Sequence, residues 1–477
     1  MSSRPRVVVI GGGIAGLSAA LNLQNSKEVD VTILEASSRI GGRIHTSTIN
    51  NEVVELGAGW IHDSTSNPLY DAAREINVVL SKGFNCDASE FGSVTFYTLG
   101  QANELPTKLA NEVYEAYEKI YDDCKTTASE LNESLGLGIY YGNKFEHYLE
   151  NNAEHSSLKR SLFEWIMRNE CHSSGVKSLE NVDIKSSPEY SVDEKDSFTL
   201  PHGYNKLLER IFEDLDEETV RFNHEVVSIK WKPKAEETSS SVVSITCSNG
   251  EIFTAEHVIV TLPLGVLKSR HEVIFNPPLP QIKKDAINRL GYGTINRIYL
   301  VFEKAFWSNE IKGMGLLWTN LDSNNWPSWV KELYIFYPTH KGSNVLVTWL
   351  SGEAAIQIES ISDQEIAHEC TRVLKAFTGL KEIPGIKEVM KTKWHSNKLS
   401  RGSYTYIPRY SGGADIDILA SPLPHLEGEA QGNVPCKILF AGEATNRSAY
   451  ATTHGAYISG VREAKRILDY RNFKGVN

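Results

Sequence analysis

Apolar residues gather in short runs along the chain, separated by glycine-rich or polar segments. Residues 7–10 form an unbroken apolar run that predicts a buried strand, and the apolar, alanine-rich residues 17–23 predict a helix. Residues 31–34 predict a second buried strand. A strand, a helix and a strand in this order predict a βαβ unit with two parallel strands.

Further apolar patterns continue to the C-terminus. Residues 97–211 have helical apolar spacing and predict a mostly helical region, and residues 454–468 predict a long final helix. A chain of 477 residues with 41% hydrophobic residues is too long for one compact core, so we expect two domains. Short apolar runs predict strands at residues 226–231, 242–247, 256–263, 291–302, 342–349 and 437–443, with a polar loop at 236–241.

The first predicted strand runs directly into Gly11-x-Gly13-x-x-Gly16. Gly11 permits a tight turn, Gly13 lets the backbone approach a pyrophosphate, and Gly16 lets the helix pack closely on the strand. The helix N-terminus offers unpaired N–H groups to the phosphates. Glu35 ends the second strand, where its carboxylate can accept hydrogen bonds from ribose hydroxyls. These residues predict a dinucleotide site; a purely structural glycine turn is the alternative.

A second glycine pair follows this acid and precedes Arg43. A simple NAD domain does not need it, whereas a cofactor with a bulkier second half requires a second close approach of the backbone. Arg43 can neutralise phosphate charge. The motif LEA-x-x-R-x-GGR at residues 34–43 resembles the FAD-binding N-terminus of the flavin-containing amine oxidases. We therefore expect FAD as the cofactor.

The resemblance implies an α/β (α+β) fold of two domains, in which a Rossmann-like FAD-binding domain is interleaved with a mixed-sheet and helical substrate-binding domain. We expect the FAD-binding domain to comprise residues 1–80, 200–290 and 391–477. The substrate-binding domain is expected to comprise residues 81–199 and 291–390. Ligand sites favour domain seams, so we expect the cofactor at this one.

Composition argues against several other classes of protein. The net charge of −11 argues against nucleic acid as a partner and favours cationic small molecules, although acidity also serves solubility. No apolar run approaches the roughly 18 residues that span a bilayer, so we expect no membrane partner. The six cysteines form no CxxC pair, so we expect reduced thiols and no metal site. We expect a cytoplasmic location, because residues 474–477 carry no peroxisomal signal. We also expect a monomer or a weak homodimer.

Five longer blocks narrow the resemblance to the polyamine oxidase branch of that family. They are residues 56–62, 261–267, 291–307, 394–406 and 440–464. The resemblance implies oxidation of a secondary amine of spermine, spermidine or their N-acetyl derivatives, with O2 as the electron acceptor. The expected products are a shorter polyamine, an aminoaldehyde and hydrogen peroxide.

The resemblance also implies which residues hold FAD. Val226 and Thr453 are expected to contact the cofactor through their backbones. Ser403 stands where monoamine oxidases attach FAD to a cysteine, so we expect non-covalent binding. Besides the glycine turn and Glu35, the expected cofactor-binding residues are Gly42, Arg43, Gly57, Ala58, Trp60, Val226, Trp394, Gly442, Glu443 and Thr453.

On the substrate side, Tyr404 and Thr452 occupy the positions that flank the amine in this family, often as two aromatic rings. Only Tyr404 is aromatic here. His62 matches a histidine that lines the amine tunnel, where it can set substrate protonation or hydrogen-bond the amine; a structural histidine is the alternative. Residues 170–174 resemble a segment of the tunnel wall, which a helix C-terminal turn also explains.

Arg297 departs from the family pattern. The family places a lysine here, bridged by water to the flavin, and arginine keeps the charge but cannot lose a proton. We expect Arg297 to be catalytic, with altered oxygen reactivity or imine hydrolysis. Two other functions stay open: a flavin-fold protein of low turnover that binds an apolar, steroid-like ligand, and an oxidase of another amine class.

Overall fold

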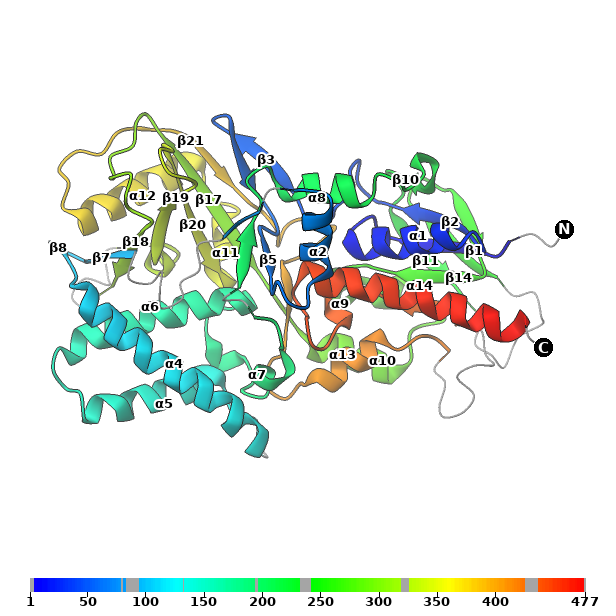
Figure 1. Ribbon diagram of the computed structural model, residues 1–477, viewed down its shortest axis with the longest axis horizontal. Coiled ribbons are helices and arrows are strands. Elements are labelled where there is room, and N and C mark those ends of the chain that lie inside the picture. The colour runs from blue at the N-terminus through cyan, green and yellow to red at the C-terminus, as the bar shows by residue number, and fades with distance from the viewer. Residues whose placement is uncertain are drawn as a thin grey trace.

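The computed structural model describes residues 4–78, 80–82, 94–131, 133–193, 196–231, 242–318, 326–424 and 436–475. The molecule is elongated, with two lobes side by side along its longest axis (Figure 1). Both termini lie at the outer end of the first lobe, which also contains segments from the middle of the chain. The second lobe holds a large sheet and three long helices that lie between residues 107 and 174.

A five-stranded parallel sheet forms the centre of the first lobe. β1 pairs with β2 in register from Arg6–Asp30 to Ile10–Leu34, which confirms the predicted βαβ unit. Parallel central strands are apolar because both faces of the sheet are covered. In sheet order, the strands are β10 (Val220–Arg221), β2 (Asp30–Leu34), β1 (Arg6–Ile10), β14 (His257–Val260) and β23 (Ile438–Phe440).

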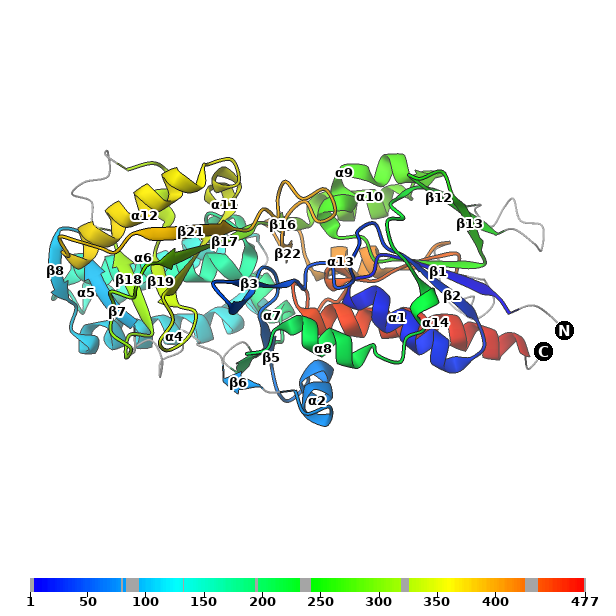
Figure 2. The same cartoon turned by 90° about the horizontal axis from the view of Figure 1, so that it is seen from above.

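The two faces of this sheet have different cores. Val7 and Val9 of β1 face α1 (Ile14–Ser26) and α14 (Thr453–Gly475), which pack along each other (Figure 2). Val8 and Ile10 face a four-stranded sheet and its helices. This second layer comprises β13 (Ile252–Ala255), β12 (Val243–Cys247), β11 (Val226–Lys230), β15 (Phe275–Asn276), α9 (Leu264–Ile274), α10 (Gln281–Arg289) and α13 (Gly413–Ala420).

A seven-stranded mixed sheet forms the centre of the second lobe, with helices on both sides (Figure 2). Its strands, in order, are β21 (Ile386–Lys391), β17 (Ile295–Phe302), β20 (Val345–Ser351), β19 (Ile335–Pro338), β18 (Gly313–Leu317), β7 (Val94–Thr98) and β8 (Gln101–Glu104). α11 (Gly352–Ile358) and α12 (Asp363–Thr378) cover one face, and α4 (Thr107–Glu130), α5 (Leu137–Glu150) and α6 (Ser156–Ser174) cover the other.

The prediction of a mostly helical region at residues 97–211 is confirmed by α4, α5, α6 and the helix at Tyr204–Ile211, but the region also contains strands that the prediction missed. β7 and β8 occupy residues 94–104, and β9 (Ser197–Thr199) lies near the other end. β7 pairs in parallel with β18, more than two hundred residues further along the chain. β7 is short and its partner strand is distant in the sequence, so the local sequence pattern did not predict this strand.

Small sheets and short helices join the lobes. β16 (Gly291–Gly293) pairs with β22 (Tyr404–Tyr406), and β5 (Trp60–His62) pairs with β9, which pairs with β6 (Ser81–Lys82). The pairs β16–β22 and β5–β9 each join a predicted FAD-binding segment to a predicted substrate-binding segment, whereas β6 and β9 both lie in the predicted substrate-binding domain. The remaining elements are β3 (Thr46–Ile49), β4 (Glu52–Glu55), α2 (Pro68–Glu75), α7 (Ser186–Glu189), α8 (Tyr204–Ile211) and 3-10 turns at Leu179–Asn181, Glu217–Thr219, Val330–Glu332 and Glu443–Thr445.

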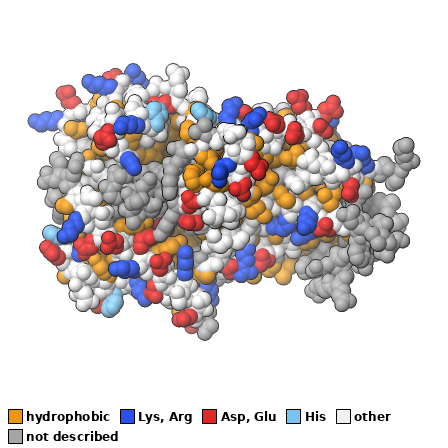
Figure 3. All heavy atoms as spheres, in the orientation of Figure 1, with side chains coloured by type: hydrophobic (Ala, Val, Ile, Leu, Met, Phe, Trp, Pro, Cys, Tyr) orange, Lys and Arg blue, Asp and Glu red, His pale blue; other side chains and the backbone are white. Residues whose placement is uncertain are grey.

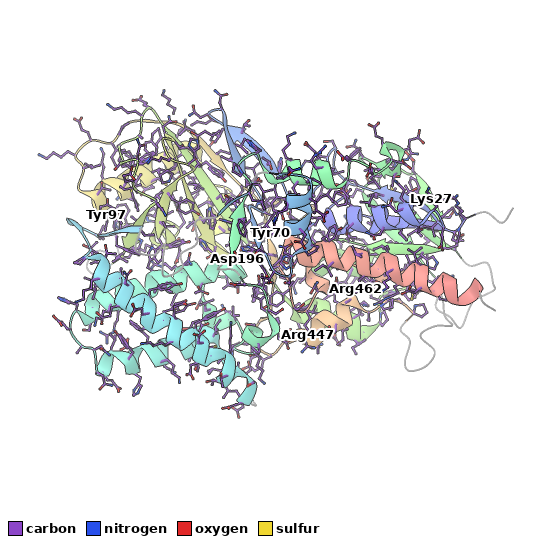
Figure 4. All side chains as sticks on the ribbon, in the orientation of Figure 1. Lys27, Tyr70, Tyr97, Asp196, Arg447 and Arg462 are labelled. Carbon is purple, nitrogen blue, oxygen red and sulfur yellow. The ribbon has the colours of Figure 1, made fainter. Side chains whose placement is uncertain are left out.

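Arg447 ties the two lobes at their junction (Figure 4). Its guanidinium lies 2.5 Å from the Glu189 carboxylate on α7 and 2.8 Å from the Asp417 carboxylate on α13. Within the described ranges, no helix is both long and apolar enough to cross a membrane. The five cysteines that the structure describes are buried and are not in disulfides, while Cys86 and the polar loop at 236–241 lie outside those ranges.

Candidate active site

A cavity of about 1120 Å³ runs between the two lobes. Residues of β1, β2 and α14 line one end, and residues of α4, α5 and α6 line the other. All the predicted cofactor-binding and catalytic residues line this cavity except Gly16, and Glu170, His172 and Ser174 of the predicted tunnel-wall segment line it as well. On the face shown in Figure 3, hydrophobic side chains gather near the middle of the molecule, where the lobes meet.

The glycine turn at the C-terminal end of β1 has the geometry that close packing requires. Gly11 has a φ of +107°, which favours glycine, and its N–H donates to Leu34 O at 2.9 Å. A Cβ at Gly16 would lie 2.0 Å from Gly11 O, so this glycine allows α1 to pack against the turn. A Cβ at Gly13 would meet nothing within 4 Å, because Gly13 faces the open cavity at the N-terminus of α1.

Glu35 lies directly after β2 and is almost fully buried. Its carboxylate accepts hydrogen bonds from Gly12 N at 2.6 Å and from Ser37 N at 2.8 Å. Its backbone carbonyl accepts from His224 N at 2.8 Å, which brings the start of β11 and Val226 beside the turn. Strand order therefore brings the acid and Val226 to one end of the cavity.

Arg43, which is partly buried, and Glu443, which is buried, form an ion pair in the cavity wall. Arg43 Nη1 donates to Glu443 Oε1 and to Ser403 O, both at 2.8 Å. Glu443 also accepts from Ala451 N at 2.9 Å and from Thr405 Oγ1 at 3.1 Å. The ion pair therefore joins two segments that lie four hundred residues apart in the sequence.

The residues of this end fit a dinucleotide. Gly13 and Gly442 leave open space where side chains would otherwise project, and Gly442 has a φ of +127°. The N-terminus of α1 adds N–H groups with a positive dipole end, and Arg43 adds a permanent cation. These groups suit a pyrophosphate, and Glu35 suits a ribose.

Arg297 lies at the other side of the cavity, between two tryptophans. Its guanidinium lies 5.5 Å from the Trp60 ring and 5.1 Å from the Trp349 ring. Nη1 donates to the backbone carbonyl of Glu55, which also accepts from Tyr299 Oη at 2.7 Å. Arg297 therefore fixes the segment that runs from Glu55 to Trp60 along the cavity wall.

Trp394 holds the same segment from the other side. Its Nε1 donates to Leu56 O at 2.8 Å, and its ring would lie 3.2 Å from a Cβ at Gly57. Ala58 N donates to Arg43 O at 3.1 Å. Gly57 and Ala58 thus lie between Arg43 and Trp394, and both line the cavity.

Two histidines line the cavity near these tryptophans. His62 Nδ1 lies 2.5 Å from Ser197 Oγ of β9. His172 Nδ1 lies 3.0 Å from Tyr334 Oη. Burial lowers the pKa of His172 to about 3, and the nearby charge of Arg297 adds to the effect. The His172 imidazole is therefore neutral at physiological pH.

Tyr404 and Thr452 differ in what they offer the cavity. The Tyr404 hydroxyl donates to the backbone carbonyl of His172. Thr452 Oγ1 donates to Ala449 O at 2.7 Å and accepts from Gly455 N at 2.9 Å. The Thr452 hydroxyl therefore caps the N-terminus of α14, which is a structural role that its side chain already fills. Thr453 Oγ1 lies 2.7 Å from the Tyr204 hydroxyl.

The chain matches the family model described as flavin containing amine oxidoreductase over residues 14–468. It belongs to this family. It is 34% identical to the peroxisomal N(1)-acetyl-spermine/spermidine oxidase of Homo sapiens, over 97% of this chain and 95% of that protein. It is 30% identical to probable polyamine oxidase 5 of Arabidopsis thaliana, over 98% and 99%. A solved putrescine oxidase variant, 19% identical, has the same fold with a TM-score of 0.71 over 98% and 99%.

Family membership confirms the predicted fold and the predicted cofactor, FAD. The dinucleotide end of the cavity is the part of the protein that fits this cofactor. The site roles assigned to individual residues stay predictions. The structure adds one group that the sequence did not single out: a stripe of aromatic and charged side chains on α4. It comprises Tyr114, Tyr117, Glu118, Tyr121, Asp122 and Lys125, which all line the cavity.

A periodic signal for this stripe is present in the sequence. The six positions are spaced by three, one, three, one and three residues, which places them on one face of a helix. Glu170 and Tyr141 line the cavity opposite, from α6 and α5. Burial, followed by the charge of Glu170, raises the pKa of Tyr117 well above its usual value, so the Tyr117 hydroxyl stays neutral.

Proposed function

We propose that this protein is a FAD-dependent polyamine oxidase. Its substrate is spermine, spermidine or an N-acetyl derivative, and O2 accepts the electrons. One C–N bond at a secondary amine is oxidised and hydrolysed with water. The products are a shorter polyamine, an aminoaldehyde and hydrogen peroxide. Family membership and the named relatives support this proposal.

The observation that carries the proposal is the continuity of the cavity. One end has a glycine turn, a buried acid and a helix N-terminus, and the other end has an aromatic and acidic wall. Carboxylates of Glu118, Asp122 and Glu170 suit the ammonium groups of a polyamine, and tyrosine rings suit its methylene chain. A long, flexible, cationic chain fits this wall better than a rigid apolar ligand does.

The cofactor end is assigned to the residues that surround the turn. When bound, FAD would supply an acceptor for a hydride equivalent from the carbon next to nitrogen and a donor of electrons to oxygen. Gly13, Arg43 and the N-terminus of α1 hold the phosphates, and Glu35 holds the ribose. Glu443 orients Arg43 through their 2.8 Å ion pair.

The substrate end is assigned to Tyr404, His62 and Arg297. Tyr404 and Trp60 bound the space that the reacting amine occupies. Arg297 carries a permanent positive charge, and His172 is neutral there, so a protonated amine is disfavoured beside them. The reacting nitrogen therefore binds in its neutral form, as an amine oxidation requires.

Steady-state turnover with product analysis tests the proposal. We expect hydrogen peroxide and an aminoaldehyde in equal amounts from one or more of spermine, N-acetylspermine and spermidine, with mass spectrometry showing which C–N bond is broken. FAD-loaded protein that binds these amines without peroxide formation would support the alternative, a flavin-fold binding protein of low turnover. Turnover with amino acids alone would support an oxidase of another amine class.

A further inference from the structure

Trp349 lies where the seven-stranded sheet meets the cavity. It is on β20, directly opposite Arg297 of β17. Side chains alternate along β20, so Leu346 and Leu350 are buried in the core below α12, while Trp349 lies on the other face with Val347. Trp349 is only partly buried, and it lines the cavity. A large aromatic ring left partly open inside a pocket is typical of a ligand contact.

Neighbouring side chains hold the Trp349 ring in one orientation. Trp60 meets it edge to face with ring centroids 4.8 Å apart, and Tyr337 does so at 5.7 Å. The His172 ring is tilted against it at 5.6 Å, and the Arg297 guanidinium lies 5.1 Å from it. These neighbours come from four different elements, so the ring is a rigid part of the cavity wall.

The same wall contains Tyr404. The Tyr404 hydroxyl donates to the backbone carbonyl of His172, whose ring contacts Trp349. His172 therefore links two aromatic side chains that both line the cavity. Thr452, whose hydroxyl caps α14, offers no ring to this space.

The charges around Trp349 determine what it can hold. Arg297 already lies against the ring, and its permanent charge repels an ammonium group. His172 is neutral because of its burial. The open part of the ring therefore suits methylene groups and an uncharged amine, whereas ammonium groups suit the carboxylates of α4 and α6.

We propose that Trp349 contacts the substrate and holds the carbon next to the reacting nitrogen between its ring and Tyr404. Arg297 acts on this contact by keeping the nearby nitrogen uncharged. The inference rests on the proposed polyamine oxidase function. It goes beyond that function by assigning the substrate contact and the choice of nitrogen to a residue of the seven-stranded sheet.

Substitutions at Trp349 test the proposal in anaerobic stopped-flow experiments, which give the apparent Kd of spermine and the limiting rate of flavin reduction separately. We expect Trp349→Ala and Trp349→Leu to raise the apparent Kd by about 10- to 100-fold, since each removes a large aromatic contact. Trp349→Phe keeps a ring and is expected to restore most of the affinity. Reoxidation of the reduced protein by O2 should not change.

Trp318→Phe is the matched control, because Trp318 packs in the core of the same lobe against Phe377 at 5.0 Å. A second readout is binding of a long α,ω-diamine without inner nitrogens, followed by the shift of the flavin spectrum. Its affinity should fall in the same variants, because the methylene contact is lost.

Wild-type affinity in Trp349→Leu would overturn the proposal, as would equal losses in Trp349→Phe and Trp349→Leu. If Trp349→Ala does not fold, the comparison of Trp349→Leu with Trp349→Phe tests the proposal. If wild-type flavin is not reduced by any polyamine, the proposed function fails first, and the diamine titration still tests the contact.

Discussion

Gly13 at the N-cap of α1 and Gly16 inside α1 should respond in different ways to substitution by alanine. Gly13→Ala adds a methyl group that meets no protein atom within 4 Å, because Gly13 faces the cavity. Gly16→Ala adds a methyl group 2.0 Å from the backbone oxygen of Gly11 and 3.2 Å from Val9 Cγ1. The first change should therefore affect the cofactor, and the second should affect the fold.

The expected magnitudes follow from these contacts. Overpacking costs about 1–3 kcal/mol, and a chain of 477 residues loses about 1 °C of Tm per kcal/mol, so Gly16→Ala should lower the Tm of the cofactor-free protein by about 1–3 °C. Gly13 has a φ of −76°, which alanine adopts freely, so Gly13→Ala should leave this Tm nearly unchanged. The methyl group displaces a pyrophosphate instead, which should weaken FAD binding by about 10- to 100-fold.

The assay is thermal unfolding of cofactor-free protein, combined with titration of FAD followed by flavin fluorescence. The reasoning fails if Gly13→Ala binds FAD as tightly as the wild type, because the glycine turn would then not lie against the cofactor. It also fails if Gly16→Ala melts at the wild-type temperature, because α1 would then not pack as closely as the structure has it.

Three further predictions concern charges in and near the cavity. Arg297→Gln should raise the apparent pKa in the pH profile of flavin reduction, measured by stopped flow, by about one to two units, because loss of the cation lets the bound amine keep its proton. An unchanged profile would show that Arg297 does not affect the protonation of the amine. Glu443→Ala should lower the free energy of urea unfolding by about 1–3 kcal/mol because it removes the carboxylate paired with Arg43 and leaves Arg43 with its hydrogen bond to Ser403 O, and Glu443→Gln should cost less; equal small losses would show that the ion pair contributes little to stability. Burial lowers the pKa of His454 from 6.5 to about 4, so its neutral form stabilises the fold above about pH 6.5, and this contribution is lost as the pH falls toward 4; His454→Asn should flatten the stability curve in that window, and an unaltered slope would contradict the shift.

The sequence allowed the dinucleotide end of the cavity to be predicted because its chemistry is local. Gly11, Gly13, Gly16 and Glu35 lie within one βαβ unit, where strand and helix periodicity fix their relative positions. The family blocks extended this to Arg43 and to residues near the C-terminus. Glu443 pairs with Arg43 across four hundred residues, which only the resemblance indicated.

The substrate end was harder to predict, because its wall is assembled from non-local strands. Trp349 faces the cavity only because β20 pairs with β17 in the register that sets it opposite Arg297. A shift of one residue would turn it toward α12. The α4 stripe had a helical period in the sequence, but nothing local showed that this face meets α6 across a cavity.

Thr452 shows a different limit. Its position in the family blocks predicted a role beside the amine, while the structure shows its hydroxyl in the cap of α14. This cap depends on the backbone turn at the start of α14, which the amino-acid composition of the segment does not predict. The catalytic role of Thr452, the oligomeric state and the cellular compartment stay predictions.

Anaerobic mixing of the FAD-loaded protein with spermine, N-acetylspermine and spermidine tests the central claim most directly. The flavin absorbance near about 450 nm reports the redox state of the cofactor. The account predicts rapid bleaching by at least one of these amines, with the yellow colour returning when O2 is admitted. Persistent colour with all three amines, in protein that demonstrably contains FAD, would contradict it.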